Sequence, residues 1–296
     1  MSTSHERPAR FDIGVVGAGR VGAVLGAALA RAGHRVTAVS AVSEASRGRA
    51  AGLLPGVPVR SVPDVIEGAH LVILAVPDDT LPGLVTGLHR AGVFTPGQIV
   101  MHTSGAHGIS VFEPAADSDI VPLAVHPAMA FTGTAMDLER LTDCCFAVTT
   151  MDLTRPLGEA LVIEMGGEPV WVPESQRLVY HAALTHVSDH LVTLVAQSLQ
   201  MLAEAGVEDP ARILEPLLTA SLSNALQLGD GALGGPVSRG DAETVASHVD
   251  LLASEAPDVL ATYVAMARAT AQRAVLSGRL GAATAEPVLE ALSDGS

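Results

Sequence analysis

Two hydrophobic patterns divide the chain. Between residues 11 and 172, short apolar runs alternate with helical patterns; the runs read FDIGVVG, HRVTAVS, HLVILAVP, GQIVMHTS, DIVPLAVHP, CFAVTT and EPVWVP. Several of them are apolar throughout, as strands must be when helices cover both faces of their sheet. The pattern predicts an α/β domain with a doubly wound, mostly parallel sheet of the Rossmann type, in which HLVILAVP is expected to be the fourth strand.

After residue 172 the strand-like runs disappear and helical periodicity takes over. Helices are expected at residues 174–205, 210–228, 241–254, 257–276 and 283–292, with an irregular glycine-rich segment, GDGALGGPVSRGD, at 229–241. The pattern predicts an all-α domain over residues 173–296. Residues 1–10 are polar and charged, and we expect a disordered tail there.

Composition narrows the partners of the protein. The chain has 32 acidic against 17 basic residues, a net charge of -15, and all its basic residues are arginine. Such a balance lacks the basic surface of a nucleic-acid binder and would be repelled by an anionic membrane. No apolar run reaches the roughly 18 residues of a membrane span. We expect a cytoplasmic protein with a small-molecule partner, in which Cys144 and Cys145 are buried free thiols.

A glycine motif follows the first strand. In GVVGAGRVG, the residues Gly17, Gly19 and Gly22 have the G-x-G-x-x-G spacing at the start of a helix. The first glycine permits a tight turn, the second lets the backbone approach a pyrophosphate, and the third lets helix and strand pack closely. The motif predicts a dinucleotide site that also includes Arg20 and Val21.

The end of the second strand bears on the choice of dinucleotide. Proteins specific for NAD usually have an acidic residue there, but this chain has Ser40, followed by Ser43, Arg47 and Arg49. Hydroxyls and arginines suit a 2'-phosphate, so NADP(H) is favoured over NAD(H); the alternative is that the arginines are solvated helix residues. Backbone contacts with the cofactor are expected at Val76 and Pro77.

Two further strand ends carry candidate chemistry. Thr103 and Ser104 should reach the carboxyl edge of the sheet, where the cofactor is expected. Thr103 is a candidate cofactor contact and Ser104 is a candidate substrate contact. A simple serine-glycine turn would explain the two residues equally well. His126 ends another strand and is a candidate substrate contact, while Pro127 alone would explain a rigid turn there.

The stretch YHAALTHVSDHL, residues 180–191, opens the first long helix. Helical geometry places His181, Thr185, Ser188 and Asp189 on one polar stripe, next to an expected core stripe of Leu184, Val187, Leu191, Leu194 and Val195. His186 and His190 lie on a separate stripe without a third ligand, so we expect no metal site. The alternative for the first stripe is a solvated surface.

Hydride transfer to a carbonyl carbon needs a proton donor. His181 fits that need at neutral pH, and Asp189 could bind the substrate or hold a neighbouring donor. Arg239, in the glycine-rich segment, is a candidate anchor for a substrate carboxylate, unless it pairs with an acidic neighbour.

Five motifs together carry a family resemblance: GVVGAGRVG, HTSGAHG, VHPAMAF, YHAALTHVSDHLV and GGPVSRGD. Nearly the whole chain resembles a family of bacterial Rossmann-like oxidoreductases in the superfamily of 6-phosphogluconate dehydrogenase, pyrroline-5-carboxylate reductase, prephenate dehydrogenase and ketopantoate reductase. The resemblance implies NADP binding, a cleft between domains, a helical domain of the 6-phosphogluconate dehydrogenase C-terminal type used for homodimerisation and, for some members, reduction of ketopantoate.

Two departures limit that resemblance. Hydroxyacid dehydrogenases of the superfamily use a lysine and an asparagine on the first long helix of the second domain. This chain has no lysine. Thr185 and Asp189 stand at that pair of positions, so the lysine mechanism cannot operate here.

Three hypotheses follow from the sequence. The leading one is an NADPH-dependent reductase of a small carbonyl acid, with ketopantoate as the best single substrate. The second is imine reduction or an oxidative reaction similar to that of prephenate dehydrogenase; the third is a non-catalytic NADP-binding module.

Overall fold

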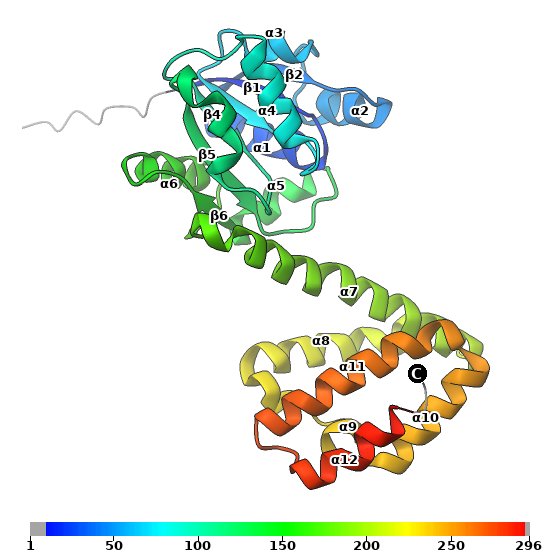
Figure 1. Cartoon of the computed structure of the whole chain (residues 1–296). Helices are drawn as coiled ribbons and strands as arrows, with labels where there is room; N and C mark the ends of the chain where they lie inside the picture. Colours follow the sequence, from blue (N-terminus) through cyan, green and yellow to red (C-terminus); the bar gives the residue numbers. More distant parts are fainter. Residues whose placement is uncertain (1–9, 294–296) are drawn as a thin grey trace, which may run out of the picture. The chain divides into compact units, whose positions relative to one another are not determined.

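The computed structural model describes residues 10–293, which form two compact units that divide between Ser188 and Asp189 (Figure 1). We call them the sheet unit, up to Ser188, and the helical unit, from Asp189 onward. The division falls inside helix α7 (Arg177–Glu204), later than the change of pattern at residue 172, because the first turn of α7 packs on the sheet. The tail expected at residues 1–10 lies outside the described residues except for Arg10.

A seven-stranded sheet, with the order β2-β1-β3-β4-β5-β6-β7, forms the centre of the sheet unit. Its strands are β1 (Asp12–Val16), β2 (Arg35–Ser40), β3 (Leu71–Leu74), β4 (Ile99–His102), β5 (Val121–Pro127), β6 (Cys145–Thr149) and β7 (Glu168–Trp171). All neighbouring strands pair in parallel except β5 and β6, which pair in antiparallel fashion. The predicted mostly parallel Rossmann sheet is therefore confirmed.

The strand formed by the run HLVILAVP is the third of the chain, so its expected place as the fourth was wrong. The segment between β2 and β3 pairs with the sheet through an isolated bridge between Val39 and Val59 and forms no strand of its own. That segment includes Pro58, whose missing N–H cannot donate to a sheet ladder.

Helices cover both faces of the sheet (Figure 1). On one face pack α1 (Arg20–Arg31), α2 (Glu44–Leu53), α5 (Met136–Arg140) and α6 (Arg155–Glu164), and on the other pack α3 (Val62–Ile66), α4 (Leu81–Arg90) and the 3-10 helix η1 (Ile109–Ser118). Every residue of β3 and of β4 is buried. This double cover explains why these strands read as continuous apolar runs.

Short 3-10 turns complete the sheet unit: η2 (Leu141–Asp143), η3 (Asp152–Thr154) and η4 (Glu174–Gln176).

The prediction that both cysteines are buried was wrong for Cys145. Cys144 is buried and Cys145 is exposed, and both are free thiols. Adjacent residues of an extended chain point to opposite sides, which separates the two side chains.

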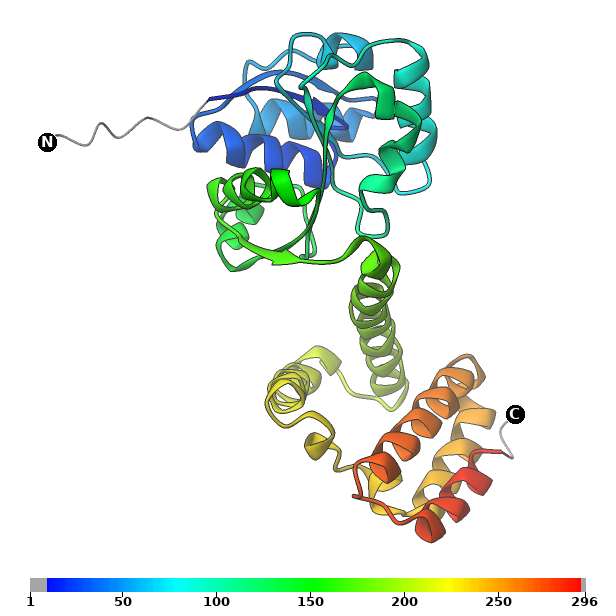
Figure 2. The same cartoon turned by 60° about the vertical axis from the view of Figure 1, so that its left-hand side comes forward.

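The helical unit contains the rest of α7, α8 (Pro210–Leu228), η5 (Gly229–Ala232), α9 (Pro236–Arg239), α10 (Ala242–Glu255), α11 (Pro257–Leu276) and α12 (Ala282–Ala291). The last three helices share a core that includes Val245, Val249 and Val264. Helix α8 lies apart from these three in Figure 2, and Leu214 is its one buried residue. None of the described helices is both long enough and apolar enough to cross a membrane.

The core stripe expected on α7 is wrong for the single chain. Val187 is 55% exposed and Leu191 is 43% exposed, while Leu184, Leu194 and Val195 are half-buried. Arg177 is the one residue of the helix that is buried. The periodicity correctly marks an apolar face, but the described chain does not cover it.

Candidate active site

The glycine loop between β1 and α1 has the geometry of a dinucleotide site. Gly17 adopts a φ of 94°, and a Cβ there would lie 2.4 Å from the carbonyl oxygen of Ala75. A Cβ at Gly22 would lie 2.1 Å from the carbonyl oxygen of Gly17. At Gly19, by contrast, no described heavy atom would come within 4 Å. The first and third glycines thus pack against backbone, and the second leaves space for a ligand at the N-terminus of α1.

Ser40 supports this loop from inside the fold. Its hydroxyl oxygen accepts a hydrogen bond from the Gly17 amide at 2.9 Å, and its carbonyl oxygen accepts one from the Ala18 amide at 2.8 Å. The side chain is buried. The hydroxyl therefore shapes the glycine turn, and any preference for a 2'-phosphate has to come from the residues that follow.

Three arginines are candidates for a phosphate contact: Arg20 begins α1, and Arg47 and Arg49 lie on α2. Arg20 and Arg47 are exposed, and Arg49 lies against Gly133, where a Cβ would be 2.8 Å from Arg49 Nε and 3.2 Å from the Cα of Arg20. With the other described residues, none of the three forms an ion pair within 4.0 Å. Ser43 caps α2, since its hydroxyl accepts from the Ser46 amide at 3.1 Å. The guanidinium groups here are available for a phosphate.

The next candidate residues follow the carboxyl ends of β3 and β4. Val76 is half-buried and Pro77 is exposed, and the Thr103 amide donates to the Leu74 carbonyl at 3.2 Å. Ser104 is buried, and its hydroxyl oxygen accepts from the His107 amide at 3.1 Å. Ser104 thus makes the turn that the sequence left open as an alternative.

Two histidines meet above Gly105, which is buried. The ring centroids of His126 and His181 are 6.3 Å apart, with an interplanar angle of 85°. A Cβ at Gly105 would lie 2.7 Å from His181 Cδ2 and 3.1 Å from His126 Nε2. His181 Nε2 is 3.9 Å from a carboxylate oxygen of Asp78, and His126 Nδ1 is 2.9 Å from the Tyr180 hydroxyl. The sheet unit therefore brings His126 and His181 together.

Burial shifts the pKa values of His126, Tyr180 and His102. Burial, and then the positive charge of Arg177, lower the pKa of His126 to about 4. Burial raises the pKa of Tyr180 to about 12. Below them, burial lowers the pKa of His102 to about 3. At neutral pH, His126 and His102 are neutral and Tyr180 keeps its proton.

Arg177 fastens α7 to the sheet. Its Nε donates to the Thr149 hydroxyl at 2.9 Å and its Nη2 to the Ala124 carbonyl at 2.7 Å. Its Nη1 is buried without a hydrogen-bond partner among the described residues, and burial lowers its pKa to about 10. A buried guanidinium without a carboxylate partner gives the edge of β5 a positive potential.

The remaining predicted residues lie along α7 and in the helical unit. Thr185 is half-buried and Ser188 is exposed at the end of the sheet unit, while Asp189 is the first residue of the helical unit. Arg239 is exposed on α9 and donates to the Gly234 carbonyl. The roles of Asp189 and Arg239 stay predictions.

The sequence reasoning missed Asp78, Gly105, Tyr180 and Arg177. Tyr180 stands inside the quoted stretch YHAALTHVSDHL, and Asp78 directly follows the quoted run HLVILAVP. Their pairing with histidines far along the chain has no local signal. Arg177 also has no local signal in the sequence, because its hydrogen-bond partners lie on two other strands.

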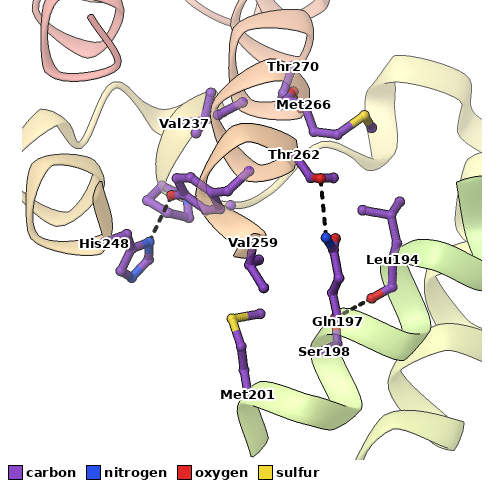
Figure 3. Close-up of a pocket in the computed structure, with 14 residues that line it drawn as sticks. Leu194, Gln197, Ser198, Met201, Val237, His248, Val259, Thr262, Met266 and Thr270 are labelled. Carbon is purple, nitrogen blue, oxygen red and sulfur yellow. Dashed lines mark hydrogen bonds between the residues drawn. The ribbon is translucent and has the colours of Figure 1, made fainter. Parts of the chain in front are cut away.

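The helical unit has a cavity of about 360 Å³ between α7, α9, α10 and α11 (Figure 3). Its lining is mostly apolar, with Met201 and Val259 on facing helices. Two polar pairs cross it: Gln197 donates to the Thr262 hydroxyl at 3.2 Å, and His248 Nδ1 is 2.9 Å from the Tyr263 hydroxyl. Within residues 10–293, no three His, Cys, Asp or Glu side chains are grouped to hold a metal ion.

Comparison with known families finds one match in each half of the chain. Residues 1–127 match the Rossmann-like domain, and residues 144–270 match a domain of unknown function, DUF2520. This combination agrees with the resemblance drawn from the five motifs. A search of curated proteins found no match.

Solved structures share the fold of this chain. A Bacteroides fragilis protein described as an NADP oxidoreductase is 18% identical, with a TM-score of 0.73 over 89% of this chain and 98% of its own. An imine reductase from Myxococcus stipitatus, in complex with NADP+, is 16% identical, with a TM-score of 0.64 over 95% of this chain and 99% of its own. A pyrroline-5-carboxylate reductase from Coxiella burnetii is 14% identical, with a TM-score of 0.53 over 90% and 98%.

Proposed function

We propose that the protein is an NADP(H)-dependent oxidoreductase that reduces a small carbonyl or imine compound. The observation that carries this proposal is the glycine loop: Gly17 and Gly22 pack on backbone, while Gly19 faces open space at the N-terminus of α1. A pyrophosphate fits such a site because amide donors and the helix dipole favour negative charge there. Structures of similar fold are described as NADP oxidoreductases and reductases.

The residues fit NADP(H) better than NAD(H). β2 ends in Ser40, whose hydroxyl is already bound by the Gly17 amide, and no carboxylate stands at that position for the ribose hydroxyls. Arg47 and Arg49 would hold the 2'-phosphate, with Ser43 at the cap of the same helix. Val76, Pro77 and Thr103 would line the site along the ends of β3 and β4. When bound, the cofactor supplies the hydride for the reduction.

The histidine pair supplies the remaining chemistry. Reduction of a carbonyl group leaves an alkoxide that needs a proton. His181, with the Asp78 carboxylate 3.9 Å from its Nε2, is the proton donor in this proposal. The Asp78 carboxylate is an ion-pair partner for the His181 ring whenever that ring carries its second proton. His126 then binds the substrate, and Thr185 and Asp189 complete the polar stripe of α7.

We propose two candidate classes of substrate. The first candidate is a 2-keto acid, with ketopantoate tested first and its carboxylate held by Arg239 or Ser104. The second is a cyclic imine, favoured because two proteins of similar fold are described as an imine reductase and a pyrroline-5-carboxylate reductase. A carboxylate at Asp189 suits a positively charged iminium better than a neutral ketone.

We also propose that the helical unit mediates homodimerisation. Leu217 on α8 is 59% exposed, Leu226 is 80% exposed, and Val192 on α7 is 70% exposed. Apolar side chains that gather on one helix without cover are a sign of a protein interface. A second copy of the chain has the same unpaired apolar helices and could cover them.

A direct assay tests the catalytic proposal. NADPH oxidation is followed with ketopantoate, a panel of other 2-keto acids and a panel of cyclic imines, each with wild-type protein and with His181→Gln. The proposal expects turnover on at least one panel and a loss of about 100-fold or more in kcat for the variant. Tight NADP+ binding without turnover on either panel would favour a non-catalytic NADP-binding module.

A further inference from the structure

Tyr180, in the first turns of α7, contacts one of the two site histidines. Its hydroxyl oxygen is 2.9 Å from His126 Nδ1, and the two rings meet edge to face at an angle of 84°. The other ring nitrogen, Nε2, lies on the side of Gly105, where a Cβ would be 3.1 Å away. One nitrogen of His126 is therefore bound by the protein, and the other borders the space next to His181.

The direction of this hydrogen bond fixes the tautomer of His126. A tyrosine hydroxyl has one proton to donate, and His126 Nδ1 is the one hydrogen-bond partner that the described residues give it. If His126 donated instead, the half-buried phenol proton would need another acceptor. With the Tyr180 hydroxyl donating and Nδ1 accepting, the proton of the neutral ring resides on Nε2.

Neighbouring charges agree with a neutral ring. Burial and the Arg177 charge lower the pKa of His126 to about 4, and burial keeps Tyr180 protonated with a pKa of about 12. Asp78 acts in the opposite direction on His126 but has the smallest effect. His181 adds a further positive charge when it is protonated, which disfavours a second cation on His126.

We propose that Tyr180 is a positioning residue that holds His126 in its Nε2–H tautomer, so that a neutral imidazole offers a hydrogen-bond donor to an oxygen or nitrogen acceptor of the substrate. The inference rests on the proposed reductase function and divides the work of the two histidines. His126 polarises the acceptor atom without giving up its proton, because loss of that proton would leave an imidazolate. His181 delivers the proton.

The chain contains a matched control for this contact. In the helical unit, the Tyr263 hydroxyl is 2.9 Å from His248 Nδ1, and the two rings meet at 81° with centroids 5.8 Å apart (Figure 3). The Tyr180 pair has centroids 5.6 Å apart. Tyr263→Phe removes the same hydroxyl from the same type of pair, with no candidate site residue in contact.

Nitrogen NMR of the full-length protein tests the inference. The protein is labelled with ¹⁵N-histidine, and His126 is assigned with the variant His126→Gln. The expected wild-type spectrum has a protonated Nε2 and an unprotonated Nδ1 at neutral pH. Tyr180→Phe should give a mixture of tautomers, lower kcat about tenfold and leave the Kd for NADP+ unchanged. Tyr263→Phe should change neither the His126 signals nor kcat.

Two results would overturn the inference. The first is a wild-type His126 protonated on Nδ1, which the spectrum of the wild-type protein shows once His126 is assigned. The second is a folded Tyr180→Phe protein with unchanged kcat. Failure of the reductase function is recognised separately, since it means no turnover by wild-type protein while the tautomer of His126 can still be read.

Discussion

The sheet unit and the helical unit bury their apolar residues to different extents. In the sheet unit, β3 and β4 are completely buried, and helices of the same unit cover both faces of the sheet. In the helical unit, α10 to α12 form a core, whereas α8 has Leu214 as its one buried residue. An apolar pattern thus identifies a face that needs cover, but it does not say which chain supplies that cover.

The largest expected effect concerns this uncovered face. The double variant Ile213→Asp and Leu217→Asp, at two exposed positions one helical turn apart on α8, should weaken self-association by roughly 100-fold or more, because unpaired carboxylates would be buried at the interface. Sedimentation analysis of the full chain measures it. Leu153→Asp is the matched control, since Leu153 is 91% exposed on the sheet unit and should leave association unchanged. A monomeric wild type would contradict the dimer proposal.

Within the sheet unit, substitutions at two glycines of the glycine loop should affect stability differently. Gly22→Ala places a Cβ 2.1 Å from the Gly17 carbonyl oxygen and should lower the free energy of unfolding by about 1–3 kcal/mol. Gly19→Ala adds a Cβ that meets no described heavy atom within 4 Å and should change it by less than about 1 kcal/mol. Urea denaturation compares the two; equal destabilisation would argue against the packing described for Gly22.

Buried histidines make the sheet unit sensitive to acid. The pKa of His102 is about 3 in the folded protein and near 6.5 when unfolded, so the unfolded chain binds more protons between these values. Stability should be complete above about pH 6.5 and decline as the pH falls towards 3, by up to about 1.4 kcal/mol per pH unit for this proton. His102→Gln should reduce that slope in denaturation measured from pH 7 to 4, and an unchanged slope would contradict this origin.

A further expected effect concerns cofactor choice. Replacing Arg47 and Arg49 together by Glu should lower the affinity for NADP+ about 10- to 100-fold while the affinity for NAD+ changes less, because the 2'-phosphate loses both guanidinium groups. Calorimetric titration with each nucleotide measures the ratio. Arg90→Glu, an exposed arginine on α4, is the control. If the ratio stays the same, the two arginines are solvated helix residues.

Most of the fold could be predicted from the sequence because its signals are local. The glycine motif, the strands and the ends of α8 and α11 follow from periodicity, proline and glycine alone. The extra strand assumed before β3 failed because one short bridge at Val59 resembles a strand in sequence. The exposed faces of α7 and α8 were missed because burial depends on partners that periodicity does not reveal.

The candidate site was predicted only in part. His126 and His181 could be named from strand-end and helix-stripe arguments, and the sheet unit brings them together. Tyr180 and Asp78 could not be assigned roles, since each acts through a histidine more than fifty or a hundred residues away along the chain. Ser40 could be placed at the right position, but its hydroxyl binds the Gly17 amide.

The central claim is that the glycine loop binds a dinucleotide at Gly19, and calorimetric titration of NADP+ tests it most directly. Wild-type protein and the folded variant Gly19→Val are compared under the same conditions. The proposal predicts that the wild type binds NADP+ and that the variant, whose side chain would fill the space next to the helix N-terminus, loses at least about tenfold in affinity. Equal affinity of the two proteins, or no binding by the wild type, would contradict the claim.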